Sequence, residues 1–148
     1  MTKLAMPKID RKLISRKVEV VADLKKIIKS ENILDHDDQT RVFETDALSA
    51  YKQKPLAVVF PENTKEVSKI LTYCSQERIK VVPRGAGTGL SGGALPLEDG
   101  ILLCLGKFNK ILEIDYKNRC VVAQPGVTNL SITQAVEGKG FYYAPDPS

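Results

Sequence analysis

The sequence predicts an α+β fold in which a strand–helix–strand (βαβ) unit is followed by an antiparallel hairpin sheet and preceded by an amphipathic helix. Three observations predict this class. Helical periodicity marks the N-terminal region, two short apolar runs flank a second helical pattern in the middle, and two further runs flank a polar turn. The 148 residues, 43% hydrophobic and 27% charged, exclude disordered, fibrous and membrane classes and allow one compact domain.

The first predicted element is an amphipathic helix that begins near Val20. Its apolar side chains recur at helical spacing, and the polar cluster at residues 35–38 ends the region. His36 lies in this cluster, where a surface position is expected, and residues 40–51 form a weakly patterned connector. We therefore divide the sequence into residues 1–54, an N-terminal helix and connector, and residues 55–148, the predicted domain.

The strand–helix–strand unit follows Pro55. Residues 56–60 are a short apolar run bounded by prolines, which is typical of a buried strand. Asn63, with Glu66 three residues later, resembles a capping box and predicts a helix over 64–76. Residues 79–82 form a second strand that Pro83 is expected to end, and this order predicts a right-handed parallel crossover.

The second half of the chain predicts further strands. Residues 101–105 are apolar, and the runs 111–114 and 120–123 flank a polar turn, which indicates a hairpin. Thr128 is positioned to cap a short helix that Gly138 and Gly140 end.

Charge and residue usage exclude several function classes. The net charge is +4, but much of the basic excess precedes Ser30, where no aromatic residue offers a stacking platform for nucleic acid. One histidine argues against a histidine-built metal site or a Ser-His-Asp triad. Cys74, Cys104 and Cys120 have no C-x-x-C spacing and are expected to be small buried hydrophobes in a reducing cytoplasm. No apolar run is long enough for a membrane span.

The most informative feature is the glycine-rich loop, residues 83–94, which directly follows a predicted strand. It holds half of the ten glycines of the protein. Glycines at this density allow the backbone to approach a ligand and let consecutive N–H groups converge on an anion. Thr88 and Ser91 add hydroxyl donors, and Arg84 adds a cation, so the loop is a candidate pyrophosphate site.

Three alternatives compete for this loop. A Rossmann fingerprint must open a helix, which Gly93, Pro96 and Gly100 prevent. A Walker loop needs a lysine after its last glycine, whereas Ala94 follows Gly93 here. The third alternative is a long connection that binds nothing, although such a connection has no evident need for hydroxyl and guanidinium groups among its glycines.

Several segments carry a resemblance to a known family: residues 46–51 (DALSAY), 55–59 (PLAVV), 82–96 (VPRGAGTGLSGGALP), 124–127 (QPGV) and 142–148 (YYAPDPS). Together they resemble FAD-linked oxidases of the vanillyl-alcohol oxidase type, which contain a PCMH-type FAD-binding domain. Within that family they are similar to glycolate oxidase D subunits and D-lactate dehydrogenases. The match at 82–96 is long and specific, and the others are individually weaker.

The resemblance implies a site in two parts. The FAD pyrophosphate lies against Arg84, Gly85, Ala86, Gly87, Thr88, Gly89, Ser91 and Gly92, and the flavin lies close to Asp146, Pro147 and Ser148. Thr88 occupies the position of the histidine that binds flavin covalently in some relatives, which implies noncovalent FAD.

The resemblance also implies an activity. Family members are oxidoreductases that oxidise a 2-hydroxy acid to a 2-oxo acid, and a later substrate domain supplies their catalytic histidines. We therefore expect this chain to be the N-terminal portion of such an enzyme, with no catalytic residue of its own, inactive alone and joined to companion subunits of a glycolate oxidase complex.

Two hypotheses of other classes stay open at this point. A stand-alone nucleotide-binding or regulatory module would use the same loop without redox chemistry, and the DNA beyond codon 148 would discriminate it from the enzyme. A nucleic-acid binder would depend on the basic residues before Ser30 and would show steep salt dependence.

Overall fold

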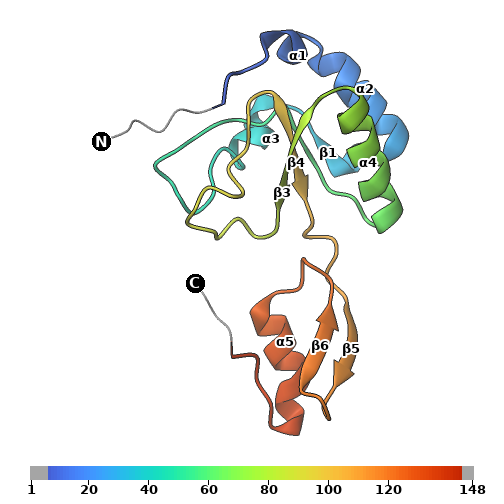
Figure 1. Cartoon of the computed structure of the whole chain (residues 1–148), viewed down its shortest axis with the longest axis vertical. Helices are drawn as coiled ribbons and strands as arrows, with labels where there is room; N and C mark the ends of the chain where they lie inside the picture. The colour runs from blue at the N-terminus through green and yellow to red at the C-terminus, as the bar shows by residue number, and fades with distance from the viewer. Residues whose placement is uncertain (1–6, 145–148) are drawn as a thin grey trace.

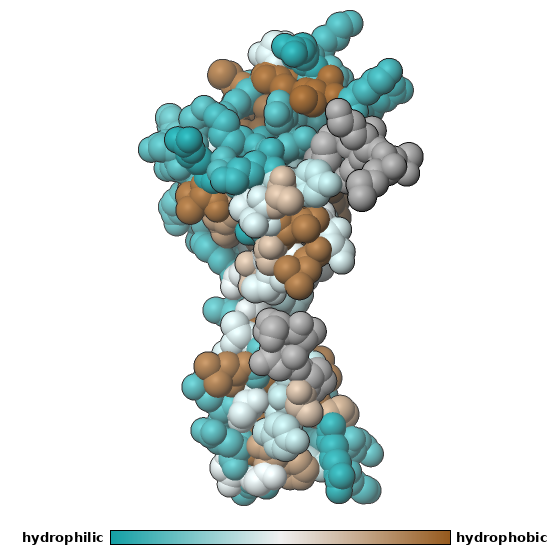
Figure 2. Space-filling view, turned by 90° about the vertical axis from the view of Figure 1, so that its left-hand side faces the viewer, coloured by the Kyte–Doolittle hydropathy of each residue, from teal (hydrophilic) through white to brown (hydrophobic). Residues whose placement is uncertain are grey.

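The structure is a computed structural model that describes residues 7–144, and it has two lobes (Figure 1). The larger lobe contains a four-stranded sheet covered by helices, and the smaller lobe contains a two-stranded hairpin and one helix. A narrow waist joins the two lobes (Figure 2). The predicted α+β class is confirmed.

The N-terminal region forms two short helices, α1 (Arg11–Ser15) and α2 (Lys17–Ile27). The sequence predicted one helix from Val20, so the helical region begins earlier than expected. Asp10 caps α1, because its Oδ1 accepts a hydrogen bond from the Lys12 N–H at 2.9 Å. The apolar side of α2 packs on the core, as its periodicity predicted.

Three short elements that the sequence did not predict lie between α2 and the predicted connector, residues 40–51. They are the 3-10 helix η1 (Ser30–Asn32), strand β1 (Ile33–Leu34) and helix α3 (Asp37–Arg41), whose end overlaps the start of the connector. Residues 42–51 contain no helix or strand, as the weak pattern indicated. β1 pairs antiparallel with β2, with Ile33 opposite Val59. His36 caps α3 with its side chain 78% exposed, which confirms its surface position. Residues before 54 therefore share a sheet with residues after it.

The sheet order is β1-β2-β4-β3, where β2 is Ala57–Val59, β3 is Lys80–Arg84 and β4 is Gly100–Cys104. Both β2 and β3 run parallel to β4, so the crossover through α4 (Thr64–Gln76) skips one strand. The predicted helix over 64–76 is confirmed, and Asn63 Oδ1 accepts the Glu66 N–H at 3.0 Å.

The prediction that Pro83 ends the second strand is wrong. Pro83 lies within β3, opposite Leu103 of β4. β3 stands at the edge of the sheet, where one side of the backbone needs no ladder partner. A residue without an N–H group is therefore tolerated there.

The core covers both faces of the sheet. Strands β2 and β4 are buried along their whole length, as expected of central parallel strands. Helices α2 and α4 pack on one face, around Leu24, Ile70 and Ile101. On the other face Phe43 and Phe60 pack against Val58, Leu102 and Cys104.

The smaller lobe confirms the predicted hairpin and helix. β5 (Ile111–Asp115) and β6 (Cys120–Ala123) pair antiparallel, and α5 (Asn129–Val136) follows. Thr128 caps α5, and the 3-10 helix η2 (Glu137–Lys139) ends at Gly140 in a left-handed conformation. No helix within residues 7–144 is both long and apolar enough to cross a membrane.

The three cysteines do not share one environment. Cys74 and Cys104 are buried, as predicted, but Cys120 is exposed, so the prediction of a buried residue is wrong there. Cys120 opens β6 in a sheet of only two strands, which has too little neighbouring structure to cover it. All three thiols are free.

Candidate functional site

The glycine-rich loop begins at the carboxyl end of β3 and belongs to the connection that leads back to the start of β4. Because β3 and β4 are parallel, this connection must run the length of the sheet, and it does so without a helix. In Figure 1 it lies beside residues 44–53, at the lower edge of the larger lobe. Ligands in open parallel sheets bind at the carboxyl ends of strands, so this position suits a binding loop.

The backbone of the loop presents a row of free hydrogen-bond donors. Within the described residues, the N–H groups from Gly85 to Gly93 donate to no acceptor. These residues are exposed or half-buried. Gly87 and Gly92 adopt left-handed conformations, with φ of 77° and 74°. Successive amides with such reversals form concave anion-binding surfaces. The loop can therefore hold a phosphate or pyrophosphate group.

Arg84 places its guanidinium directly under this loop. Its Nη1 donates to the Thr45 carbonyl at 2.7 Å and to the Ala94 carbonyl at 3.5 Å. Its Cζ lies 5.7 Å from the centre of the Phe43 ring, a cation–π arrangement. A Cβ atom at Gly87 would lie only 2.3 Å from Arg84 Nη2. The positive charge is therefore fixed against the amide row, where it adds to the attraction for an anion.

The remaining predicted residues of the loop are accessible. Ala86, Thr88, Gly89 and Ser91 are exposed, and Gly92 is half-buried. Among the described residues, the hydroxyls of Thr88 and Ser91 have no hydrogen-bond partner, so both can donate to a ligand. Three predicted flavin neighbours, Asp146, Pro147 and Ser148, lie outside the described residues.

Sequence reasoning gave no role to one residue at this site, Asp46. Its side chain is 5% exposed and accepts hydrogen bonds from the Leu48 N–H at 2.9 Å and the Ala94 N–H at 3.4 Å. The neighbouring Ala47 N–H donates to the Gly87 carbonyl at 2.9 Å. The signal was present, since Asp46 opens one of the segments that carry the family resemblance, but no local pattern tied it to the loop.

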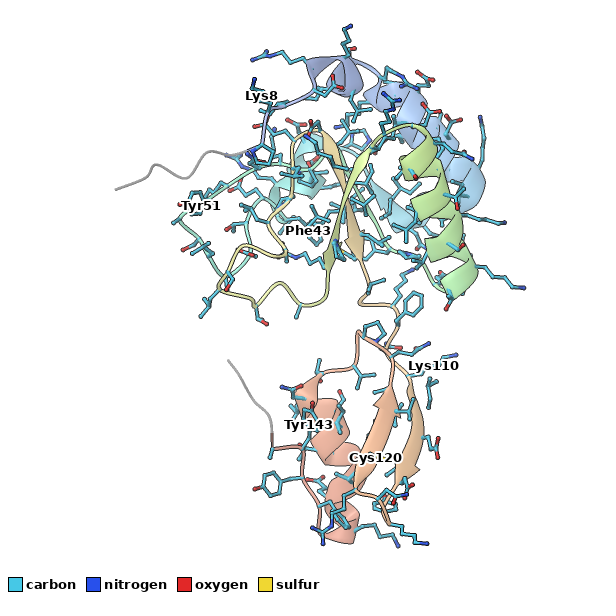
Figure 3. All side chains as sticks on the ribbon, viewed as in Figure 1. Lys8, Phe43, Tyr51, Lys110, Cys120 and Tyr143 are labelled. Atoms are coloured by element: carbon cyan, nitrogen blue, oxygen red, sulfur yellow. The ribbon has the colours of Figure 1, made fainter. Side chains whose placement is uncertain are left out.

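A cavity of 540 Å³ lies elsewhere, between the hairpin and α5. Its walls include Cys120, Ile132, Val136 and Phe141, and most of its surface is apolar. Figure 3 shows Cys120 and Tyr143 in this smaller lobe, away from the glycine-rich loop. An apolar cavity without a row of donors does not suit phosphate, so the loop is the better candidate for that ligand.

The fold and the loop together define a class: an α+β domain with a glycine-rich loop whose free amides suit a phosphate-containing cofactor. Residues 55–148 match the FAD binding domain family, and the chain belongs to this family. The loop fits FAD, because a pyrophosphate is the kind of group that a row of free amides beside a guanidinium can hold. The resemblance identified in the sequence is confirmed.

Several related proteins align with more of the chain than the family match covers. The chain is 46% identical over 144 residues to the glycolate oxidase subunit GlcD of Escherichia coli, covering 97% of this chain and 28% of that protein. It is 45% identical over 130 residues to the same subunit of Bacillus subtilis, covering 88% and 28%. A D-lactate dehydrogenase of Anaerostipes hadrus is 37% identical over 123 residues, with 82% and 26% covered. The chain thus spans about a quarter of the length of these proteins.

Solved structures confirm the fold. A 4-ethylphenol oxidase from Gulosibacter chungangensis superposes with a TM-score of 0.74 at 26% identity, covering 92% of this chain and 27% of that one. A p-cresol methylhydroxylase with bound substrate gives 0.72 at 22% identity, covering 89% and 26%. These are the PCMH-type domains that the sequence predicted. The names of these relatives and structures give no support to a redox-inactive module.

Proposed function

We propose that this chain forms the pyrophosphate-binding part of a flavin-dependent oxidoreductase that oxidises a small 2-hydroxy acid to a 2-oxo acid. The observation that carries the proposal is the row of free amides from Gly85 to Gly93 inside a chain that belongs to the FAD binding domain family. The substrate class is supported by relatives named for glycolate, D-lactate and D-2-hydroxyglutarate.

The residues of the loop contribute three kinds of group to cofactor binding: backbone amides, hydroxyls and one guanidinium. Backbone amides of Gly85, Ala86, Gly87, Gly89 and Gly92 would hold the pyrophosphate, and the hydroxyls of Thr88 and Ser91 would add two donors. The Arg84 guanidinium, held against the Thr45 and Ala94 carbonyls, supplies positive charge beside the amides. Hydrogen bonds to a charged group each contribute about 1.5–3 kcal/mol, so a few of them suffice to anchor the cofactor. Asp146, Pro147 and Ser148 are proposed as neighbours of the flavin ring.

Bound FAD supplies the redox chemistry by taking two electrons from the substrate. The described residues of this chain bind and orient the cofactor, and none of them is assigned a catalytic role. Catalytic groups are expected from the remainder of a full-length enzyme, so oxidation is expected only from such a chain. Noncovalent FAD, a cytoplasmic location and companion subunits belong to the same proposal, the last supported by relatives named as subunits.

The test uses the protein expressed from the complete open reading frame that contains these codons. It is expected to purify with flavin absorbance, to release the flavin on acid precipitation, and to reduce a dye with glycolate, D-lactate or D-2-hydroxyglutarate. L-lactate serves as the stereochemical control. A preparation that holds no flavin, even after incubation with FAD, would refute the proposal.

A further inference from the structure

The shape of the glycine-rich loop depends on a segment that precedes the matched family domain. We call residues 44–53 the bracing segment. It closes on itself through a hydrogen bond from the Gln53 N–H to the Glu44 carbonyl at 2.7 Å. The preceding residue, Phe43, packs edge-on against Phe60 at 5.9 Å and joins the core beneath the sheet. The bracing segment is therefore fixed at its base.

Contacts between the bracing segment and the loop occur at several successive points. Thr45 accepts from Arg84, Ala47 donates to Gly87, and Asp46 accepts from Ala94. Apart from the bond between the adjoining Leu95 N–H and the Gly92 carbonyl, the hydrogen bonds that link Gly85–Ala94 to other described residues end at Arg84 or at residues 46–47. Figure 3 shows Phe43 on the inner side of this segment and Tyr51 at its outer edge.

Asp46 is the side chain at the centre of these contacts. A carboxylate that is 5% exposed is stable only if its oxygens are hydrogen-bonded. Each carboxylate oxygen accepts one backbone hydrogen bond. Oδ1 accepts from the Leu48 N–H in the bracing segment, and Oδ2 accepts from the Ala94 N–H in the loop. The side chain thus joins the fixed segment to the end of the loop.

This connection leaves the ligand-facing amides free. The loop is held by the Gly87 carbonyl, the Ala94 N–H and the Arg84 side chain, whereas the N–H groups between Gly85 and Gly93 stay unpaired. We infer that Asp46 is a positioning residue of the cofactor site, which fixes the loop in its anion-binding shape without touching the ligand. The inference rests on the proposed FAD site.

The test compares Asp46→Ala with Asp38→Ala in the protein from the complete open reading frame. Asp38 is an exposed acid on α3 with no contact to the loop, so its variant makes the same charge change. Asp46→Ala is expected to raise the FAD dissociation constant about tenfold or more and to speed hydrogen exchange at the Ala47 N–H, which donates to the Gly87 carbonyl of the loop. Exchange in β2 and β4 should stay unchanged, which a merely structural role would not predict.

A second variant protects the test against misfolding. Asp46→Asn keeps one acceptor for Leu48 but turns an amide donor toward the Ala94 N–H, so it is expected to lose affinity for FAD while retaining the fold. Wild-type affinity in both Asp46 variants, or exchange at the Ala47 N–H equal to that of Asp38→Ala, would overturn the inference. Exchange is measured without FAD, so failure of the wild-type protein to bind FAD would refute the proposed function separately.

Discussion

Gly87→Ala is the substitution at which the structure makes its sharpest prediction. Gly87 has a φ of 77°, a conformation that costs an alanine about 1–2 kcal/mol. The new Cβ would also lie 2.3 Å from Nη2, 2.5 Å from Cζ and 2.6 Å from Nε of Arg84. The guanidinium must move, which breaks its 2.7 Å hydrogen bond to the Thr45 carbonyl.

The magnitude follows from these two costs. A hydrogen bond to a charged group contributes about 1.5–3 kcal/mol, so strain and displacement together reach about 3–5 kcal/mol. Without ligand the loop can relax part of this strain, so the cost falls largely on the bound state. We expect the FAD dissociation constant to rise at least about a hundredfold.

Two other glycines provide matched controls. Gly92 has a φ of 74°, but a Cβ there meets only Leu48 Cδ2 at 3.6 Å, so Gly92→Ala should cost strain alone, about tenfold in affinity. Gly138 lies outside the loop with open space within 4 Å, and Gly138→Ala should bind FAD as the wild type does. The assay is FAD titration of the flavin-free protein, with thermal unfolding to exclude loss of the fold. Equal affinities across the three variants would refute the reasoning.

Three further predictions concern stability and reactivity. Gly126→Ala should lower the free energy of unfolding by several kcal/mol in denaturant titration, because its Cβ would lie 2.5 Å from the Leu105 carbonyl oxygen and 2.8 Å from that of Phe108. Hydrogen bonds from Asn32 and two lysines lower the pKa of Glu62 to about 2. The stabilisation from the ionised Glu62 carboxylate is therefore complete above about pH 4.5 and lost as the pH falls toward 2. Glu62→Gln should make the free energy of unfolding, measured by urea titration, fall less steeply across this pH range. A thiol reagent should modify Cys120 rapidly in the folded protein, whereas burial raises the pKa of the other two thiols to about 11 and delays them until unfolding; rapid modification of all three would contradict the described burial.

Elements specified by local sequence were predictable. The helix at 64–76 has its cap, its periodicity and its end within one short stretch, so tertiary contacts were not needed to locate it. The hairpin at 111–123 likewise places two apolar runs around one polar turn. Pro83 was misjudged because its effect depends on whether its strand is central or at an edge, which sequence alone does not state.

Elements specified by distant partners were not predictable. β1 has only two residues and exists because it pairs with β2, more than twenty positions later in the chain. The insertion of β4 between β2 and β3 is likewise a property of the assembled sheet. Glycine content and an adjacent strand were enough to select the loop as the candidate site, since those features lie within one stretch of sequence.

Asp46 shows why part of the candidate site could not be predicted from the sequence. The carboxylate and the Ala94 amide it accepts are separated by 48 positions, and the segment around Asp46 has neither helical nor strand periodicity. The family match begins at residue 55, yet Thr45, Asp46 and Ala47 make the contacts that shape the loop of that domain. A glycine-rich loop alone has too many accessible conformations to present its amides to one ligand. With Asp46 in its inferred positioning role, the bracing segment restricts those conformations, so the proposed site includes residues on both sides of the boundary at residue 54.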